Sequence, residues 1–191
     1  IKPDYVEAQY SLGIMLQDLG QFKAAIKCYE MVLAIKPDFA GAYNISGVCY
    51  KAIGRLDAAV KSFEKALALK PDYIEACYNL GVTLKELGQL DAAVKSYEKA
   101  LTLKPDYTDA HYNLGNAFKE LGQPDDAIKI FEKALAVNPD SAEAHNNVGI
   151  AYVHNSLGAA IHSLGQHEAA LKCYKNALAI KPDYSDVYLN R

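Results

Sequence analysis

Prolines that recur at a fixed interval are the feature that most constrains how this chain can fold. Five of them stand 34 residues apart and a sixth follows after 43 residues, at Pro3, Pro37, Pro71, Pro105, Pro139 and Pro182. A fixed period of this length is typical of stacked supersecondary units, each of which packs mainly on its neighbours. With 191 residues the chain holds about five and a half such units. We therefore expect a repeat array.

Each unit is predicted to contain two helices. In the third unit one helix is expected from about Tyr73 to Glu86 and the next from about Leu90 to Leu103, with Gly88 between them. Glycine ends the first helix at little steric cost, and proline followed by aspartate ends the second. The predicted unit is a helical hairpin.

Small residues recur where the two helices of a hairpin must meet. A glycine recurs in the first helix and an alanine in the second: Gly13, Gly47, Gly81, Gly115 and Gly149; Ala25, Ala59, Ala93, Ala127 and Ala170. A glycine inside a helix costs about 1 kcal/mol in helix propensity, so its repeated use indicates that a side chain there would hold the two helices apart. We therefore expect the helices of the third hairpin to cross closely at Gly81 and Ala93. Larger residues should fill the adjoining core layers, namely Leu12, Leu80 and Leu114, and Tyr29, Phe63, Tyr97, Phe131 and Tyr174. Stacked neighbours are needed to bury them.

The whole pattern resembles the tetratricopeptide repeat. In the first helix it has a leucine-glycine pair followed by an aromatic residue such as Tyr50 or Phe118. In the second helix it has an alanine, an aromatic residue and a second alanine, and the proline follows that helix. The second alanines are Ala66, Ala100, Ala134 and Ala177. The resemblance covers essentially the whole chain. It implies an all-α fold, a right-handed superhelical solenoid of antiparallel helix hairpins whose first helices line a concave groove that binds peptides or protein segments. We divide the array into repeats at 5–38, 39–72, 73–106, 107–140 and 141–183, with the start of a further repeat at 184–191.

Asparagines recur at one position of the predicted groove. Asn79, Asn113 and Asn147 each precede the core leucine or valine of their repeat, and Asn190 takes the same place in the last one. An amide both donates and accepts, so a row of them could pair with the backbone of an extended peptide whatever its side chains. We assign these three asparagines to a peptide-binding ladder, together with the neighbouring Tyr78, Tyr112 and Asn146. Ser11 and Ile45 interrupt the row, and the alternative is that asparagine merely tolerates a solvated helix face.

Acidic residues recur near the start of the first helices, at Glu7, Glu75, Asp109, Glu143 and Asp186. They could form an acidic rim that selects basic peptides. Each follows an aspartate by three residues, however, as in the run from Asp72 to Glu75, and this spacing resembles a capping box. We favour capping. The carboxylate-clamp class of these repeats would need lysine or arginine at the same positions, so it is excluded.

Composition excludes other classes of function. The chain carries 20 basic and 23 acidic residues, a net charge of -3, so no strong field favours nucleic acid or an anionic membrane. The histidines show no i,i+4 pair, and repeated residue types on a surface do not converge as catalytic groups must. We therefore expect a binding module rather than an enzyme, with no cofactor and no metal.

Cysteine usage bears on the compartment. Cys28, Cys49, Cys77 and Cys173 form no CxxC pair and are predicted to be small buried hydrophobes, which favours a reducing environment. No charged-then-apolar leader opens the sequence and no apolar run approaches the length of a membrane span. We expect an intracellular protein, cytoplasmic or nucleocytoplasmic.

The fifth repeat contains an irregularity. Residues 145–153 are followed by a similar run at 154–162, which indicates a nine-residue tandem duplication and accounts for the interval of 43 residues. Nine residues make two and a half helical turns, so both copies cannot keep one register. We expect either a lengthened helix or a bulge near 155–158.

Three functions remain open from the sequence. The first is a scaffold that binds an extended segment of a partner protein. The second is the substrate-recognition arm of an intracellular O-glycosyltransferase, because Tyr78-Asn79-Leu80-Gly81 resembles the repeat arm of the O-linked N-acetylglucosamine transferases and their Spindly-type relatives. The third is self-assembly, since the chain stops inside a repeat and the last apolar face should be poorly covered.

Overall fold

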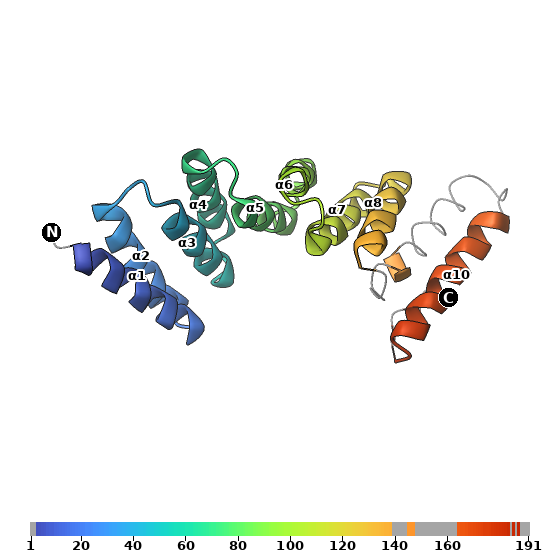
Figure 1. The fold of residues 1–191 in the computed structure, drawn as a ribbon, viewed down its shortest axis with the longest axis horizontal. Helices are drawn as coiled ribbons and strands as arrows, with labels where there is room; N and C mark the ends of the chain where they lie inside the picture. Colours follow the sequence, from blue (N-terminus) through green and yellow to red (C-terminus); the bar gives the residue numbers. More distant parts are fainter. Residues whose placement is uncertain (1–2, 139–144, 148–163, 184, 186, 188–191) are drawn as a thin grey trace. The chain divides into compact units, whose positions relative to one another are not determined.

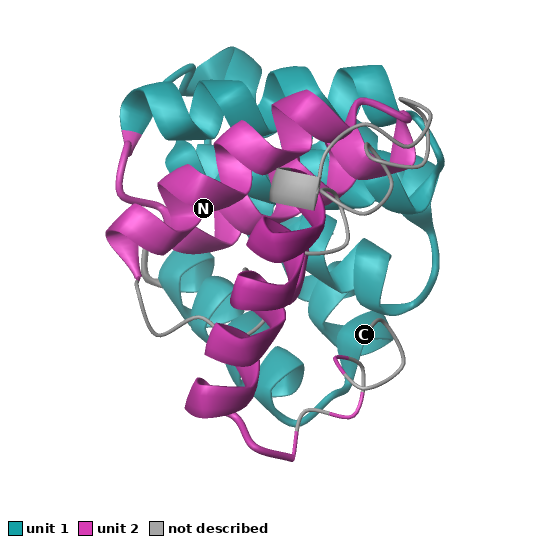
Figure 2. Cartoon of the chain, turned by 90° about the vertical axis from the view of Figure 1, so that its right-hand side faces the viewer, with its two compact units in different colours: residues 1–103 teal, residues 104–191 magenta. Residues whose placement is uncertain are grey.

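A computed structural model of the chain describes residues 3–138, 145–147, 164–183, 185 and 187. Regular structure in these ranges is α-helical throughout (Figure 1), which confirms the predicted all-α class. The helices are α1 (Pro3–Asp18), α2 (Phe22–Ile35), α3 (Ala40–Ala52), α4 (Leu56–Leu69), α5 (Ile74–Glu86), α6 (Leu90–Leu103), α7 (Thr108–Glu120), α8 (Pro124–Val137) and α10 (Leu164–Ile180). The chain divides into two compact units, unit 1 (Ile1–Leu103) and unit 2 (Lys104–Arg191), which are coloured separately in Figure 2.

Successive helices pair as hairpins. In unit 1, α1 packs on α2, α3 on α4 and α5 on α6, and the hairpins stack because α2 packs on α3 and α4 on α5. In unit 2, α7 packs on α8 in the same way. The predicted repeating unit, a helical hairpin, is confirmed at each of these four pairs.

Glycines end the first helices as predicted. Gly88 has a φ of 74°, in the left-handed region where a side chain would be strained. Its N–H donates to the carbonyl of Lys85 at 2.9 Å, and the N–H of Gln89 donates to the carbonyl of Leu84 at 2.9 Å. These two bonds form a Schellman motif, and positive-φ glycines stand at the same place at Gly20, Gly54 and Gly122.

A lysine-proline-aspartate-aromatic turn joins successive hairpins. The N–H of Tyr73 donates to the carbonyl of Lys70 at 3.2 Å, and Lys70 Nζ lies 4.9 Å from the centroid of the Tyr73 ring. Lys36 lies 5.0 Å from the Phe39 ring centroid and Lys104 lies 5.1 Å from that of Tyr107. Each turn thus combines a proline-restricted backbone with a cation–π contact.

This turn overturns the capping-box prediction. The N-cap of α5 is Tyr73 rather than Asp72, and no side-chain capping bond is made there or at Phe39 and Tyr107, the N-caps of α3 and α7. The backbone turn places the start of the helix one residue beyond the aspartate. Glu75 still lies in the first turn of α5, where a carboxylate interacts favourably with the helix dipole.

The repeated glycines of the first helices allow an aromatic ring to approach. A Cβ at Gly81 would lie 2.7 Å from Cε1 of Tyr97, and one at Gly47 would lie 2.6 Å from Cε1 of Phe63. Equivalent contacts join Gly13 to Tyr29 and Gly115 to Phe131. Close packing was predicted correctly, but its partner was not: the nearest atoms to Gly81 belong to the Tyr97 ring rather than to Ala93.

The core of each unit consists largely of small residues and rings. Ala59, Ala93 and Ala127 are fully buried, as are Phe63 and Tyr97. The predicted leucine layer holds only in part, because Leu114 is 2% exposed whereas Leu12 is 44% exposed. Leu80 is half-buried. The core is therefore less regular along the array than its period suggests.

The cysteines are free thiols. Cys28, Cys49 and Cys77 are buried, as predicted, and Cys173 is half-buried. Burial raises the pKa of the Cys49 thiol to about 11, so this group stays protonated at neutral pH. These residues act as small hydrophobic side chains.

Some predictions fall outside the described residues. Most of the nine-residue duplication lies in 148–163, and Asn190 and Glu143 are also outside the described ranges. In the part of the chain that the structure describes, no helix combines the length and apolar character needed to cross a membrane.

Candidate functional site

Polar side chains of successive hairpins are linked by hydrogen bonds in unit 1. Asn79 Nδ2 on α5 donates to Asn44 Oδ1 on α3 at 3.3 Å. Asn44 Nδ2 in turn donates to the hydroxyl of Tyr73, the residue that precedes α5, at 3.4 Å. Because Asn44 is 7% exposed, this connection is partly shielded from water. The two amides are held in fixed orientations.

Aromatic rings adjoin these amides. The Tyr10 ring on α1 lies 4.8 Å from the Phe39 ring and 5.9 Å from the Tyr29 ring, centroid to centroid. Burial, together with the neighbouring Tyr73 hydroxyl, raises the pKa of Tyr10. We call Tyr10, Phe39, Asn44, Tyr73 and Asn79 the first-helix face. They come from three successive hairpins of unit 1 and from the turns before α3 and α5.

The predicted tyrosines pack into their own hairpins. The Tyr78 ring lies 6.1 Å from the Tyr97 ring, and the Tyr112 ring lies 6.3 Å from the Phe131 ring. Both tyrosines are half-buried. They support the aromatic layer of the core and expose only part of their surface.

The predicted asparagines differ in exposure. Asn79 and Asn113 are half-buried, whereas Asn146 is 4% and Asn147 is 5% exposed. In unit 2, Asn113 Nδ2 donates to the carbonyl of Asp109 on its own helix at 2.9 Å, and Lys119 Nζ donates to Asn147 Oδ1 at 3.2 Å. Only Asn79 and Asn113 therefore combine the predicted position with appreciable exposure.

Sequence reasoning missed Asn44, Phe39 and Tyr73. Asn44 stands at the register position of Tyr78 and Tyr112, one residue before the interrupted ladder position at Ile45. The signal for the two rings was available, since an aromatic residue directly follows each of these lysine-proline-aspartate runs. Its regular recurrence could have indicated a role at the hairpin junction.

Charged groups lie near the other end of the first helices. Lys51 Nζ on α3 forms an ion pair at 2.9 Å with Oε1 of Glu86, an exposed residue of α5. The hydroxyl of Tyr50 donates to Glu30 Oε1 at 2.9 Å. Glu7 on α1 and Glu75 in the first turn of α5 are exposed. Both signs of charge thus flank the first-helix face, and within the described ranges no three His, Cys, Asp or Glu side chains are arranged as metal ligands.

Comparison with known families decides the classification. A TPR repeat profile matches residues 47–88 and 83–122, and two tetratricopeptide repeat profiles match residues 106–183 and 6–39. Together they span most of the chain. The chain belongs to the tetratricopeptide repeat (TPR) family.

Solved TPR structures share its fold. A crystal structure of MamA protein superposes with a TM-score of 0.85 at 26% identity, covering 97% of this chain and 96% of that one. YrrB, described as a TPR protein with an unusual peptide-binding site, gives a TM-score of 0.81 at 24% identity over 95% of this chain and 89% of that one. MamA from Desulfovibrio magneticus RS-1 gives a TM-score of 0.85 at 19% identity, covering 96% of this chain and 99% of that one. A comparison with curated protein sequences gave no match.

Proposed function

We propose that this TPR chain is a protein-interaction scaffold whose first-helix face binds an extended segment of a partner protein. The observation that carries the proposal is the linked pair of Asn44 and Asn79: Asn44 orients the half-exposed amide of Asn79 and donates in turn to the hydroxyl of Tyr73. Membership of the TPR family supports it, as does likeness in fold to YrrB, which has a peptide-binding site.

The chemistry of the amide suits a backbone ligand. A carboxamide offers two donor hydrogens and two acceptor lone pairs, and the bond from Asn79 to Asn44 uses one of the donors. The remaining capacity matches the N–H and C=O groups of an extended peptide. Because Asn44 already fixes the orientation of the Asn79 side chain, little rotamer entropy is lost when a peptide binds.

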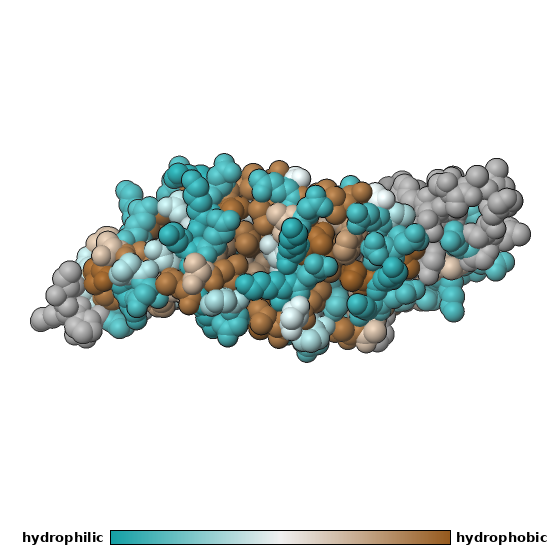
Figure 3. Space-filling model, turned by 90° about the horizontal axis from the view of Figure 1, so that it is seen from above, coloured by the Kyte–Doolittle hydropathy of each residue, from teal (hydrophilic) through white to brown (hydrophobic). Residues whose placement is uncertain are grey.

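Aromatic rings supply the apolar part of the interaction. Tyr10, Phe39 and Tyr73 can cover peptide side chains of varied shape, since rings offer large contact areas with few rotatable bonds. The first-helix face thus combines rings with amides, which favours a partner segment of mixed composition over a strongly charged or wholly apolar one. Hydrophobic and hydrophilic residues are also intermixed on the side of the molecule seen in Figure 3.

Affinity should be modest. A hydrogen bond of this kind contributes about 0.5–1.5 kcal/mol net, so a pair of amides contributes a few kcal/mol at most. A transferase arm, the alternative suggested by the asparagine pattern, gains no support from the TPR relatives. We further propose an intracellular location, supported by the unpaired cysteines of the described ranges.

The test begins with a peptide selected from a displayed library of random extended sequences. Replacing Asn79 by alanine should weaken its binding by about threefold to tenfold, at one lost hydrogen bond, with little change in thermal stability. We leave Asn113 unchanged because it lies in unit 2, outside the first-helix face, and Asn147 unchanged because it is 5% exposed. Asn176→Ala is the matched control, since Asn176 is exposed on α10. Unchanged affinity of the Asn79→Ala variant in a calorimetric titration would remove this amide from the binding mechanism.

A further inference from the structure

Aliphatic side chains recur at one register position of the first helices in unit 1. They are Ile14 on α1, Val48 on α3 and Val82 on α5, and we call them the aliphatic row. Ile14 is 36% exposed, and the two valines are half-buried. Another hairpin precedes both α3 and α5, so the partial exposure of the valines is a property of this side of the helices.

Cross-helix contacts fix where the row lies on α3 and α5. The bond between Asn79 and Asn44 and the ion pair between Lys51 and Glu86 both join these two helices. Val48 lies four residues after Asn44 and three before Lys51, so it shares their side of α3. The same spacing in reverse places the α5 member of the row between Asn79 and Glu86. The row therefore continues the first-helix face.

Contacts between α1 and α3 place the first member of the row in the same way. Cys49 Sγ donates to Gln17 Oε1 at 3.6 Å, and a Cβ on Gly41 would lie 3.5 Å from the hydroxyl of Tyr10. Ile14 lies four residues after Tyr10 and three before Gln17. It thus stands between two contacts to the next first helix, as the α3 member of the row does.

The distance between members of the row selects the conformation of a ligand. Packed helices lie about 8–10 Å apart, axis to axis, and α3 contacts α5 directly. A polyproline II segment has three residues per turn, so every third side chain points the same way, at intervals of about 9 Å. Side chains on one face of a β-strand recur at about 7 Å instead. Only the polyproline II interval matches the row.

The amide of Asn79 excludes a helical ligand. An α-helix could repeat a side chain at a similar interval, because two turns span about 11 Å, but its backbone groups bond to one another. A polyproline II segment leaves its backbone N–H and C=O groups unpaired, so Asn79 can bond to them. Tyr10 stands one turn before Ile14 and adds an aromatic ring, the residue type that lines many grooves for proline-rich segments.

Charge indicates a basic ligand. Most charged residues on the first helices of unit 1 are acidic: they include Glu7, Asp18, Glu75 and Glu86, against Lys51 and Lys85. Each of these four acids lies four or seven residues from a member of the row, on the same side of its helix. The turns between hairpins are neutral, because each lysine there is followed by an aspartate two residues later. Lysine or arginine in the ligand would complement this face.

We propose that the segment bound by the first-helix face is a basic, proline-containing stretch of a partner protein in the polyproline II conformation. Its apolar side chains stand at every third position and contact Ile14, Val48 and Val82 in turn. Basic residues between them lie near the acids that flank the row. This inference rests on the proposed function and adds to it the conformation, the period and the charge of the ligand.

Paired peptides test the period with the full chain. The periodic probe repeats leucine-proline-lysine, and the permuted probe has the same composition with leucine at alternate positions. We expect the periodic probe to bind about tenfold more tightly in a calorimetric titration, since it alone presents its leucines on one side. A periodic probe with glutamate in place of lysine should bind more weakly than the lysine form.

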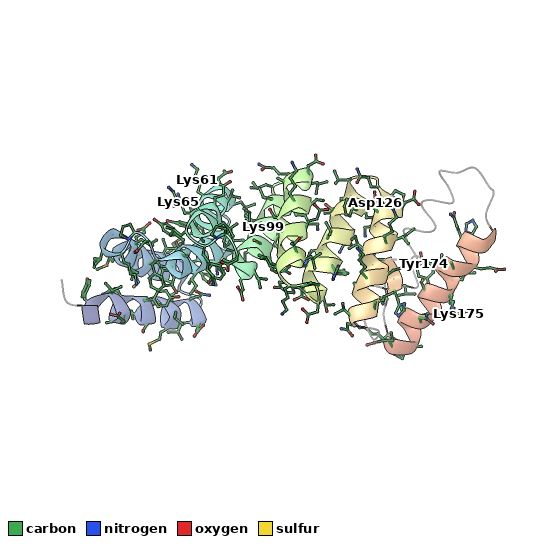
Figure 4. The ribbon with its side chains drawn as sticks, turned by 45° about the horizontal axis from the view of Figure 1, so that its top comes forward. Lys61, Lys65, Lys99, Asp126, Tyr174 and Lys175 are labelled. Carbon is green, nitrogen blue, oxygen red and sulfur yellow. The ribbon has the colours of Figure 1, made fainter. Side chains whose placement is uncertain are left out.

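Variants of the row test the contact. Val48→Asn and Val82→Asn should each weaken binding of the periodic probe by about threefold to tenfold. Asparagine is compatible with a first helix here, because Asn116 holds this register position on α7. Met31→Asn is the matched control and should leave the affinity unchanged. Met31 is 42% exposed on α2, at the register position of Lys65 and Lys99, which are labelled on the second helices in Figure 4.

The inference is overturned if the permuted probe binds as tightly as the periodic one, or if both valine variants keep full affinity. Binding of a library-selected peptide that Asn79→Ala still weakens would then leave the scaffold function standing. A library peptide that binds while neither probe does also refutes the period, whereas the failure of every peptide to bind refutes the scaffold function itself. If an asparagine variant loses helicity, Val82→Thr, which keeps the shape of valine, replaces it with the same expectation.

Discussion

Gly81 has a steric role that outweighs its cost in helix propensity. Its nearest neighbours outside its own helix are atoms of the Tyr97 ring, and that ring is fully buried. A ring enclosed on all sides cannot swing away from an added methyl group without disturbing its other contacts. The helix therefore accepts glycine where alanine would otherwise be favoured.

Gly81→Ala should consequently destabilise the protein. Alanine gains about 1 kcal/mol in helix propensity over glycine, but a Cβ placed 2.7 Å from Tyr97 Cε1 should cost more, and we expect a net loss on the order of 1–2 kcal/mol. Urea unfolding followed by circular dichroism measures it. Lys61→Ala, at an exposed position of α4 that is labelled in Figure 4, is the control and should stay within about 0.5 kcal/mol.

Removal of the ring separates packing from propensity. In a Tyr97→Leu background the same glycine-to-alanine change should cost much less, or stabilise, because the atoms it meets are gone. An equal loss in both backgrounds would show that Tyr97 is not what requires the glycine.

The sequence predicted the role of a residue where the same residue type recurs in every repeat for one physical reason. It did not predict which side chain that residue contacts. The recurrence of Gly13, Gly47, Gly81 and Gly115 predicted close packing, because no other reason explains glycine inside every first helix. Which side chain fills the space depends on the angle between the helices, and this angle is not encoded in spacing. Asn44 was missed for a related reason: it occupies a position that tyrosine holds in three other repeats, at Tyr10, Tyr78 and Tyr112.

At the scale of the helix, the two ends follow different rules. The first helices end at glycines with positive φ, whose Schellman bonds are made by backbone groups, so the sequence signal is specific. Their starts do not depend on a side-chain cap. Backbone turns closed by the N–H groups of Tyr73 and Tyr107 precede these helices instead. The aspartate before each tyrosine is not the N-cap and makes no capping hydrogen bond.

These helix ends predict an ordering of two variants. Gly88→Ala should destabilise the protein by about 1 kcal/mol or more, since φ is 74° and alanine is strained in that region. Asp72→Ala should change stability by no more than about 0.5 kcal/mol, because Asp72 is exposed and is not the N-cap. Thermal unfolding of the two variants side by side measures the difference. A larger loss at Asp72 would restore the capping explanation that the structure contradicts.

At the scale of the whole chain, the 34-residue period predicted the fold class because several independent features of the sequence recur with that same period. Turn residues, small residues and rings all recur in the same register, and each hairpin needs its neighbours for burial. The period could not predict the difference in exposure between α1 and α3, since both carry the same pattern. What differs is whether another hairpin covers the helix, and the exposed Leu12 and Met15 show the consequence on α1.

Unit 1 should fold when it is separated from the rest of the chain. Residues 1–103 contain three complete hairpins, from α1 to α6, and the division falls between α6 and α7. Three hairpins are about the minimum at which repeats of this kind bury a stable core. A fragment of residues 1–103 is expected to keep its helical circular dichroism and to unfold cooperatively in urea. A fragment of residues 1–69, which holds the first two hairpins, is the matched comparison and should unfold at a lower urea concentration, because the contact between α4 and α5 is lost. If the longer fragment is unfolded, or if both unfold at the same urea concentration, stability in this array does not accumulate hairpin by hairpin.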